Sequence, residues 1–368
     1  MLAKTWTLID STRGIHESDF DLVPADIAAV GNWRITQRTL HGGLSEGVDL
    51  IEINNGRMSL FVLPTRGMGI WKATIGDDQT LGWRSPVRGP VHPMFVPITD
   101  ESGFGWLEGF DELVVRCGLE SNGAPEFDEK GRLKYPLHGR IANRPAHHVE
   151  VTVDEKAGTI KLRGVVEETR FHFQKLRLTA TLTMNFDSTS FTINDEVENY
   201  GGTPATMQML YHINVGDPLL VPGSKIVTHV DTIESLTSEP NTEGWETMGP
   251  PVAGAPEECY AMKLTAGEDG RTQVLLKNAE GTAGSAIRFS NKELPCFTLW
   301  KNMVANTDGY VTGLEPATNF PKTRSEEEAS GRVVTLAPGE TWNAEVAVDW
   351  LTSTSEVNAV EQSLRNHG

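Results

Sequence analysis

The sequence contains only three cysteines, Cys117, Cys259 and Cys296, and no two of them stand in a CxxC spacing. This spacing fits reduced thiols rather than a disulfide framework or a thiolate metal site, so we expect ordinary buried side chains. Basic residues are also scarce, because 32 lysines and arginines face 50 acidic residues, for a formal charge of -18. This negative excess opposes binding to nucleic acids and to anionic membranes.

Long apolar runs and nucleotide-binding loops are missing as well. The first residues lack the apolar stretch of a signal peptide, and no stretch reaches the length needed to span a bilayer, which predicts a cytoplasmic protein. Neither GxGxxG nor GxxxxGK[ST] occurs, and no strand–helix rhythm is sustained. Nucleotide-dependent chemistry is therefore not expected.

The sequence does show period-two alternation of apolar and polar residues, which is typical of strands with one solvated face. The alternation from 176 to 186 is followed by a turn and resumes from 191 to 197, which predicts an antiparallel pair. Asn55-Gly56 suits the positive φ angles of a tight hairpin between 48–53 and 57–63. Further strands are predicted at 33–40, 149–153, 159–166, 286–289, 297–300 and 342–350.

Helical signals are few. Ser353 and Glu356 have capping-box spacing before an apolar face, which predicts a C-terminal helix, and a weaker helical pattern covers 106–115. With 36 glycines and 20 prolines between many short strands, the chain is predicted to be all-β, a large sandwich or barrel. Residues 1–368 are expected to form one domain. Ser238 to Glu258 is interpreted as a long loop that either shapes one wall of a cleft or decorates the surface.

Three distant segments each carry an ionisable residue among strand-forming or turn-forming neighbours: Leu137-His138-Gly139-Arg140, Tyr211-His212-Ile213-Asn214 and Thr312-Gly313-Leu314-Glu315. Together they offer one carboxylate and two imidazoles, which is an acid/base set without a nucleophile. Each also has a structural interpretation, in which His212 is a core histidine, His138 marks a turn and Glu315 is a solvated loop residue.

These segments resemble the galactose mutarotase-like superfamily in content and order. The run 196–205 that leads to His212 looks like the strand–loop–strand that delivers a catalytic histidine there, while 137–139 and 313–315 resemble the earlier histidine and late glutamate segments. The segments 63–70 and 115–119 are similar to a less characterised, DUF4432-like branch of aldose 1-epimerase-like proteins. The likeness covers about residues 33–350 and implies a large antiparallel β-supersandwich with a sugar cleft on its concave face.

The resemblance implies an aldose 1-epimerase acting on a free or modified monosaccharide. Anomer exchange needs a base for the C1 hydroxyl proton and an acid for the ring oxygen, so that the ring opens and closes again. By resemblance, Glu315 is the base and His212 the acid, approaching the sugar from opposite sides, and His138 binds or polarises a hydroxyl. Asp217 and Asp231 are the candidates for a hydroxyl-binding aspartate.

Other side chains complete the predicted cleft. Arg66 and Arg140 can donate paired hydrogen bonds to hydroxyls or to an anionic sugar group, or they balance nearby acids. Lys301 is placed at the cleft edge. Flat faces for stacking on a pyranose are offered by Trp71, Trp83, Trp106 and Trp300, although such residues are more often part of the core.

Two further hypotheses stay open on the same scaffold. One is epimerisation, isomerisation or lyase chemistry on a keto sugar or sugar acid, with metal assistance allowed; local HxH or HxxxH spacing is absent, so no metal or other cofactor is expected. The other is a non-catalytic carbohydrate-binding protein. The predicted partners are a monosaccharide and, as an allowed assembly, a second copy of the chain, with no nucleic acid and no membrane.

Overall fold

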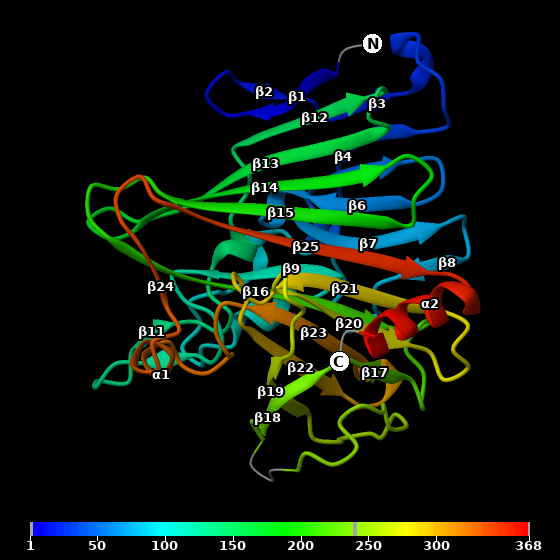
Figure 1. The fold of residues 1–368 in the computed structure, drawn as a ribbon. Helices are drawn as coiled ribbons and strands as arrows, with labels where there is room; N and C mark the ends of the chain where they lie inside the picture. The colour runs from blue at the N-terminus through cyan, green and yellow to red at the C-terminus, as the bar shows by residue number, and fades with distance from the viewer. Residues whose placement is uncertain (1–2, 238–240, 367–368) are drawn as a thin grey trace.

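The computed structural model describes residues 3–237 and 241–366. Its first large sheet has ten strands in which all neighbours pair antiparallel (Figure 1). In spatial order they are β17 (Lys225–Val227), β20 (Arg271–Lys277), β21 (Gly284–Ser290), β25 (Thr341–Leu351), β15 (Ser190–Asn199), β14 (Lys175–Asn185), β13 (Thr159–Thr169), β12 (His148–Asp154), β1 (Lys4–Asp10) and β2 (Ile15–His16).

The second large sheet has thirteen strands and is also antiparallel. Its main path is β18 (Val230–Ser235), β19 (Glu258–Leu264), β22 (Cys296–Asn302), β23 (Val311–Ala317), β16 (Ala205–Gly216), β9 (Val114–Leu119), β7 (Gly69–Ile75), β6 (Ser59–Leu63), β5 (Asp49–Asn54), β4 (Arg34–Thr39) and β3 (Asp19–Leu22), with β24 (Val334–Leu336) beside β16 and β8 (Gln79–Leu81) beside β7. A small ribbon joins β10 (Glu126–Phe127) to β11 (Leu133–Tyr135).

The alternating segments form the strands predicted for them. The pair around the turn at 187–190 is β14 with β15, and the Asn55-Gly56 hairpin joins β5 to β6 with φ of 102° at Gly56. The C-terminal helix is α2 (Thr354–Asn366). Ser353 Oγ accepts from the N–H of Glu356 as expected, whereas the Glu356 carboxylate accepts from the Ser353 hydroxyl and from the N–H of Thr352. The other α-helix is the short α1 (Arg324–Ala329).

The helix predicted at 106–115 is wrong. This stretch is a single 3-10 turn, Gly105–Gly109, followed by the start of β9. The apolar residues that suggested a helical face are buried because they cover a sheet. Tertiary contacts with that sheet explain their apolar pattern without a helix. Of the loop predicted at 238–258, residues 238–240 lie outside the described residues, and the rest contains no named strand before β19.

The main core lies between the two sheets, because alternate side chains of both sheets belong to one apolar cluster. A second, smaller cluster lies on the other face of the thirteen-stranded sheet, around Val115, Leu210 and Ala317. Helix α2 packs against the outer face of the ten-stranded sheet near β20. No helix among the described residues is long and apolar enough to cross a membrane.

A buried ion pair crosses the core and joins the two sheets. Arg116 of β9 donates from Nε and Nη2 to both oxygens of Asp195 on β15, at 2.5 and 2.9 Å, and from Nη1 to the carbonyl of Met68 at 2.7 Å. Both side chains are fully buried. Since each charge depends on the other for solvation, removal of one leaves an uncompensated charge in the core.

Asp195→Leu is therefore expected to lower the free energy of unfolding by roughly 3–5 kcal/mol, while the double variant Arg116→Met/Asp195→Leu recovers much of the loss. Urea denaturation measures both. Glu345→Gln, which breaks the exposed pair with Arg271, is the control and should cost less than about 1 kcal/mol. Equal losses for the single and double variants would show that the buried charge is not what destabilises the protein.

Candidate active site

His212 and Glu315 are direct cross-strand neighbours. Ile213 of β16 pairs with Leu314 of β23, so the next position places His212 opposite Glu315 on the face away from the main core. Nε2 of His212 lies 3.2 Å from Oε1 of Glu315. The contact has the length of an ion pair but not the alignment of a hydrogen bond, and Oε1 has no donor. The two groups lie side by side rather than on opposed sides of a cleft.

The glycine before Glu315 in this motif leaves room for the carboxylate. A Cβ added at Gly313 would lie 2.4 Å from Oε1 of Glu315 and 3.1 Å from Cε1 of His212. Residues 313 and 315 face the same side of β23, so the glutamate side chain folds back over the bare backbone of Gly313. The sequence Gly-Leu-Glu is thus a packing requirement of the pair.

A hydrogen-bonded chain fixes the orientation of the His212 ring. Asn214 donates from Nδ2 to the carbonyl of Glu112 at 3.0 Å, which turns its Oδ1 toward Nδ1 of His212 at 2.6 Å. Because Oδ1 can only accept, Nδ1 carries the proton. The free lone pair of neutral His212 is therefore on Nε2, the atom that faces Glu315.

Arg66 supports this chain from behind. Its guanidinium is buried and binds Oε1 of Glu112 from Nε at 2.9 Å and from Nη2 at 2.8 Å, and it also donates to the carbonyl of Gly109 at 2.8 Å and to Asn143. All of these partners belong to the protein. Arg66 thus positions Glu112 and the backbone that holds Asn214. This agrees with the second interpretation of the sequence, in which Arg66 balances a nearby acid.

Aromatic rings enclose His212 on several sides. The ring centroids of Phe110, His138, Trp300 and Trp106 lie 5.0, 5.4, 5.5 and 6.2 Å from its own. His138 has a φ of 54°, and Gly139 after it packs so closely that a Cβ would lie 2.1 Å from the carbonyl of Ser121. This turn is what directs the His138 ring toward His212.

Burial shifts the proton affinities of all three ionisable groups. Desolvation lowers the pKa of His212 to about 4, against a smaller raising effect of the Asn214 hydrogen bond. Desolvation, with the negative charge of Glu257, raises the pKa of Glu315 well above its usual range. Desolvation and the neighbouring His212 hold the pKa of His138 well below its usual range. Burial thus favours the neutral form of both groups of the pair, with the proton on the carboxyl group of Glu315 rather than on Nε2 of His212.

Other predicted residues lie apart from the pair. Asp217 is exposed and binds Arg84 at 3.0 Å. Asp231 is exposed on β18, three strands away from β23, or roughly 14 Å at ordinary strand spacing. Because adjacent residues of a strand point to opposite faces, Lys301 points away from the face that carries Trp300. Its ammonium group binds Glu258 at 2.7 Å. Arg140 lies 3.6 Å from Glu120.

The tryptophans divide in the same way. Trp106 and Trp300 contact the His212 ring, and Trp300 donates from Nε1 to Glu257 at 2.8 Å, so the 241–257 loop does reach the site. Trp83 packs against Phe110 with centroids 4.9 Å apart. Trp71 lies in a separate apolar cluster with Val48, Leu50 and Leu63.

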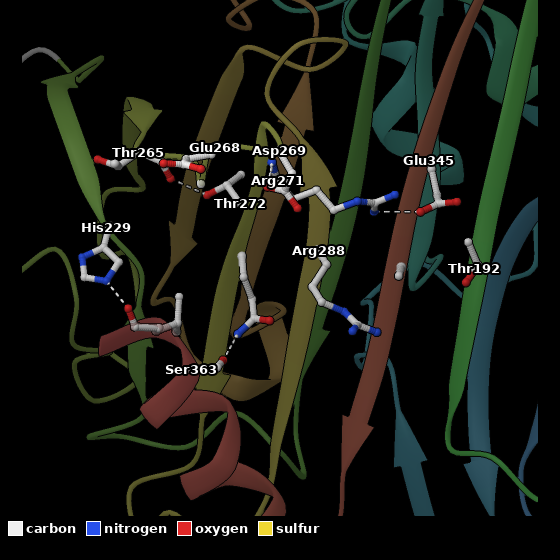
Figure 2. A pocket seen from close by; sticks show the side chains of 14 residues that line it. Thr192, His229, Thr265, Glu268, Asp269, Arg271, Thr272, Arg288, Glu345 and Ser363 are labelled. Carbon is white, nitrogen blue, oxygen red and sulfur yellow. Dashed lines mark hydrogen bonds and ion pairs between the residues drawn. The ribbon is translucent and has the colours of Figure 1, made fainter. Parts of the chain in front are cut away.

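His212 and Glu315 line none of the four best-defined cavities of the described residues. The largest, of about 770 Å³, lies on the outer face of the ten-stranded sheet beside α2, and Figure 2 shows its two arginines. Arg271 already binds Glu345 and Arg288 binds Asp349, both at 2.8 Å. The acid/base pair, 4% and 2% exposed, is the stronger candidate site because its chemistry converges there.

Sequence reasoning missed three residues that hold or enclose the His212 ring. Glu112 and Phe110 carry no motif, and the only local signal is their position between a glycine-rich turn and β9. Asn214 stands in a recognised segment, and its spacing of two from His212 puts both on one face of a strand, which was a usable signal. In the described part of the chain, no group of three His, Cys, Asp or Glu side chains is arranged to hold a metal ion.

Comparisons with solved structures agree with this fold. A "putative aldose 1-epimerase" from Klebsiella pneumoniae subsp. pneumoniae is 33% identical, with a TM-score of 0.94 over 99% of this chain and 96% of that one. A galactose mutarotase-like protein from Clostridium acetobutylicum is 15% identical, with a TM-score of 0.59 over 86% of this chain and 98% of its own. A "putative aldose 1-epimerase" from Escherichia coli K12 has 15% identity and a TM-score of 0.54 over 83% and 100% of the two chains.

No curated protein matches the chain. The model of the DUF4432 family, a domain of unknown function, matches residues 45–349, which is most of the sequence. With the structural likeness above, this shows that the chain belongs to the DUF4432 family and has a galactose mutarotase-like fold.

Proposed function

We propose that the protein is an aldose 1-epimerase that interconverts the anomers of a monosaccharide through Glu315 and His212. The observation that carries the proposal is the buried 3.2 Å contact between one carboxyl group and one imidazole, in a setting where burial raises the pKa of the first and lowers the pKa of the second. In a cyclic aldose the C1 hydroxyl oxygen and the ring oxygen are both bonded to C1. Two groups that lie side by side on one sheet face can therefore serve both oxygens.

The proposed proton path begins with transfer from Glu315 to Nε2 of His212 across their 3.2 Å contact. The carboxylate then takes the proton of the C1 hydroxyl while Nε2–H gives its proton to the ring oxygen, and the C1–O5 bond breaks to the aldehyde. This step leaves Glu315 protonated and His212 neutral, the state that burial favours. After rotation about C1–C2 the reverse steps close the ring on the other face, and each group contributes about 10²–10⁴-fold as a general acid or base.

The substrate in this proposal is a neutral sugar. Arg66 and Arg140 were the candidates for binding an anionic group, and each contacts a carboxylate of the protein instead, Arg66 with Glu112 and Arg140 with Glu120. Lys301, which was expected at the cleft edge, binds Glu258. Recognition is therefore assigned to hydrogen bonds and to the faces of Trp106 and Trp300, which suit hydroxyl groups and the C–H face of a pyranose.

Glu315→Gln is expected to lower kcat for anomer exchange by at least about 10²-fold, with sugar affinity retained, because the amide cannot take a proton. Polarimetry on D-glucose, D-galactose, D-mannose, D-xylose and L-arabinose measures the rate. The control is Glu234→Gln, an exposed carboxylate in the same row across the sheet that binds Lys322. Full activity of Glu315→Gln, or no acceleration of any of these sugars by the native protein, contradicts the proposal.

The protonation of His212 gives a second test. Nitrogen NMR is expected to show the Nδ1–H tautomer and a titration midpoint of about 4. Activity should fall as the pH drops through that value, because Nε2 of His212 then binds a proton from solvent and can no longer accept the proton of Glu315. Asn214→Leu removes the contact that raises this pKa, so the acid limb moves to lower pH and kcat falls by roughly 10-fold. A midpoint near 6.5 in both proteins would refute the buried, neutral imidazole.

A further inference from the structure

Several buried polar atoms around the acid/base pair have no hydrogen-bond partner in the protein. In the described residues, four such atoms belong to this one face of the sheet: Nε1 of Trp106, Nδ1 of His138, Oγ1 of Thr298 and Oε1 of Glu315. Buried polar groups are nearly always bonded, and each unpaired one is costly. Four within one site indicate that a polar ligand supplies the missing partners.

Thr298 is the member of this set that no motif pointed to. It lies on β22 directly opposite Glu315, and on the face shared by Cys296 and Trp300, its neighbours two residues away. Directly opposed residues have Cβ atoms about 4.5–5.5 Å apart, so the hydroxyl lies beside the carboxyl group. The side chain is fully buried, yet its oxygen bonds neither Glu315 nor any backbone group.

The order of the strands relates Thr298 to a particular part of the sugar. His212, Glu315 and Thr298 follow one another across β16, β23 and β22. In the proposed reaction His212 serves the ring oxygen and Glu315 the C1 hydroxyl. The group that continues this line past the C1 hydroxyl is the hydroxyl on C2, because C2 is the only ring carbon bonded to C1.

We propose that Oγ1 of Thr298 hydrogen-bonds the C2 hydroxyl of the sugar and so makes the site selective for aldoses that carry it. The inference rests on the proposed function, since that function assigns the C1 hydroxyl to Glu315. A hydroxyl held without a protein partner costs stability in the free protein and contributes affinity when the ligand satisfies it.

The test compares D-glucose and D-galactose with their 2-deoxy forms, by affinity from tryptophan fluorescence and by kcat/KM from polarimetry. The native protein should favour the parent sugar by roughly 2- to 12-fold, the range for one neutral hydrogen bond. Thr298→Val should bind the parent sugar as weakly as the 2-deoxy sugar and leave the 2-deoxy sugar unaffected. Thr298→Ser, which keeps the hydroxyl, should keep the preference.

Ser285→Ala is the matched control, because Ser285 is a buried hydroxyl without a partner in the other sheet. Both Thr298→Val and Ser285→Ala should leave the thermal midpoint unchanged or higher, and only the first should change sugar preference. The inference is overturned if Thr298→Val loses activity equally on parent and 2-deoxy sugars, or if it keeps the native preference. The proposed function survives either result as long as the native protein catalyses anomer exchange and Glu315→Gln does not. Failure of the native protein to bind or convert either sugar overturns both.

Discussion

The register between β16 and β23 is the constraint on which the site depends. Because side chains alternate along a strand, a shift of one residue would send either His212 or Glu315 into the main core and separate the pair. The apolar neighbours Ile213 and Leu314 fix this register, since both are completely buried between the sheets. The hydrophobic effect that assembles the sandwich is thus also the force that aligns two polar groups on its outer face.

The chemistry of the pair is set by exclusion of water. Neither side chain has a strong counter-charge, so burial makes the charged form of each unfavourable: it lowers the pKa of the His212 imidazole to about 4 and raises the pKa of the Glu315 carboxyl group. The proton of the pair is therefore held by the carboxyl group, and moving it to His212 is an uphill step of the proposed reaction. The Arg66–Glu112 ion pair is different, because there both charges are stabilised by direct hydrogen bonds and serve to hold backbone and amide groups in place.

Much of the fold follows from the sequence because period-two alternation records which face of each strand is buried, as for β14 and β25. The position of Trp106 and Phe110 does not follow from the sequence, since their apolar pattern indicates that they are buried but not which element they pack against. The helix predicted for this stretch was therefore wrong. The three motif residues His138, His212 and Glu315 are brought together. Lys301, Asp217 and Asp231 are not, because strand parity and edge exposure are decided by pairings between segments far apart in the chain.

The rings of Trp106 and Phe110 cover the pair, and the Trp300 indole is held by Glu257 from the loop that precedes β19. Under the proposed function, a hexose that reaches Glu315 has to displace part of this cover. Admission of each sugar molecule is in that case a conformational event of the protein, and its frequency sets a ceiling on the proposed turnover that improved acid/base chemistry could not raise. The same cover would keep bulk water from the open-chain aldehyde that the proposed reaction forms.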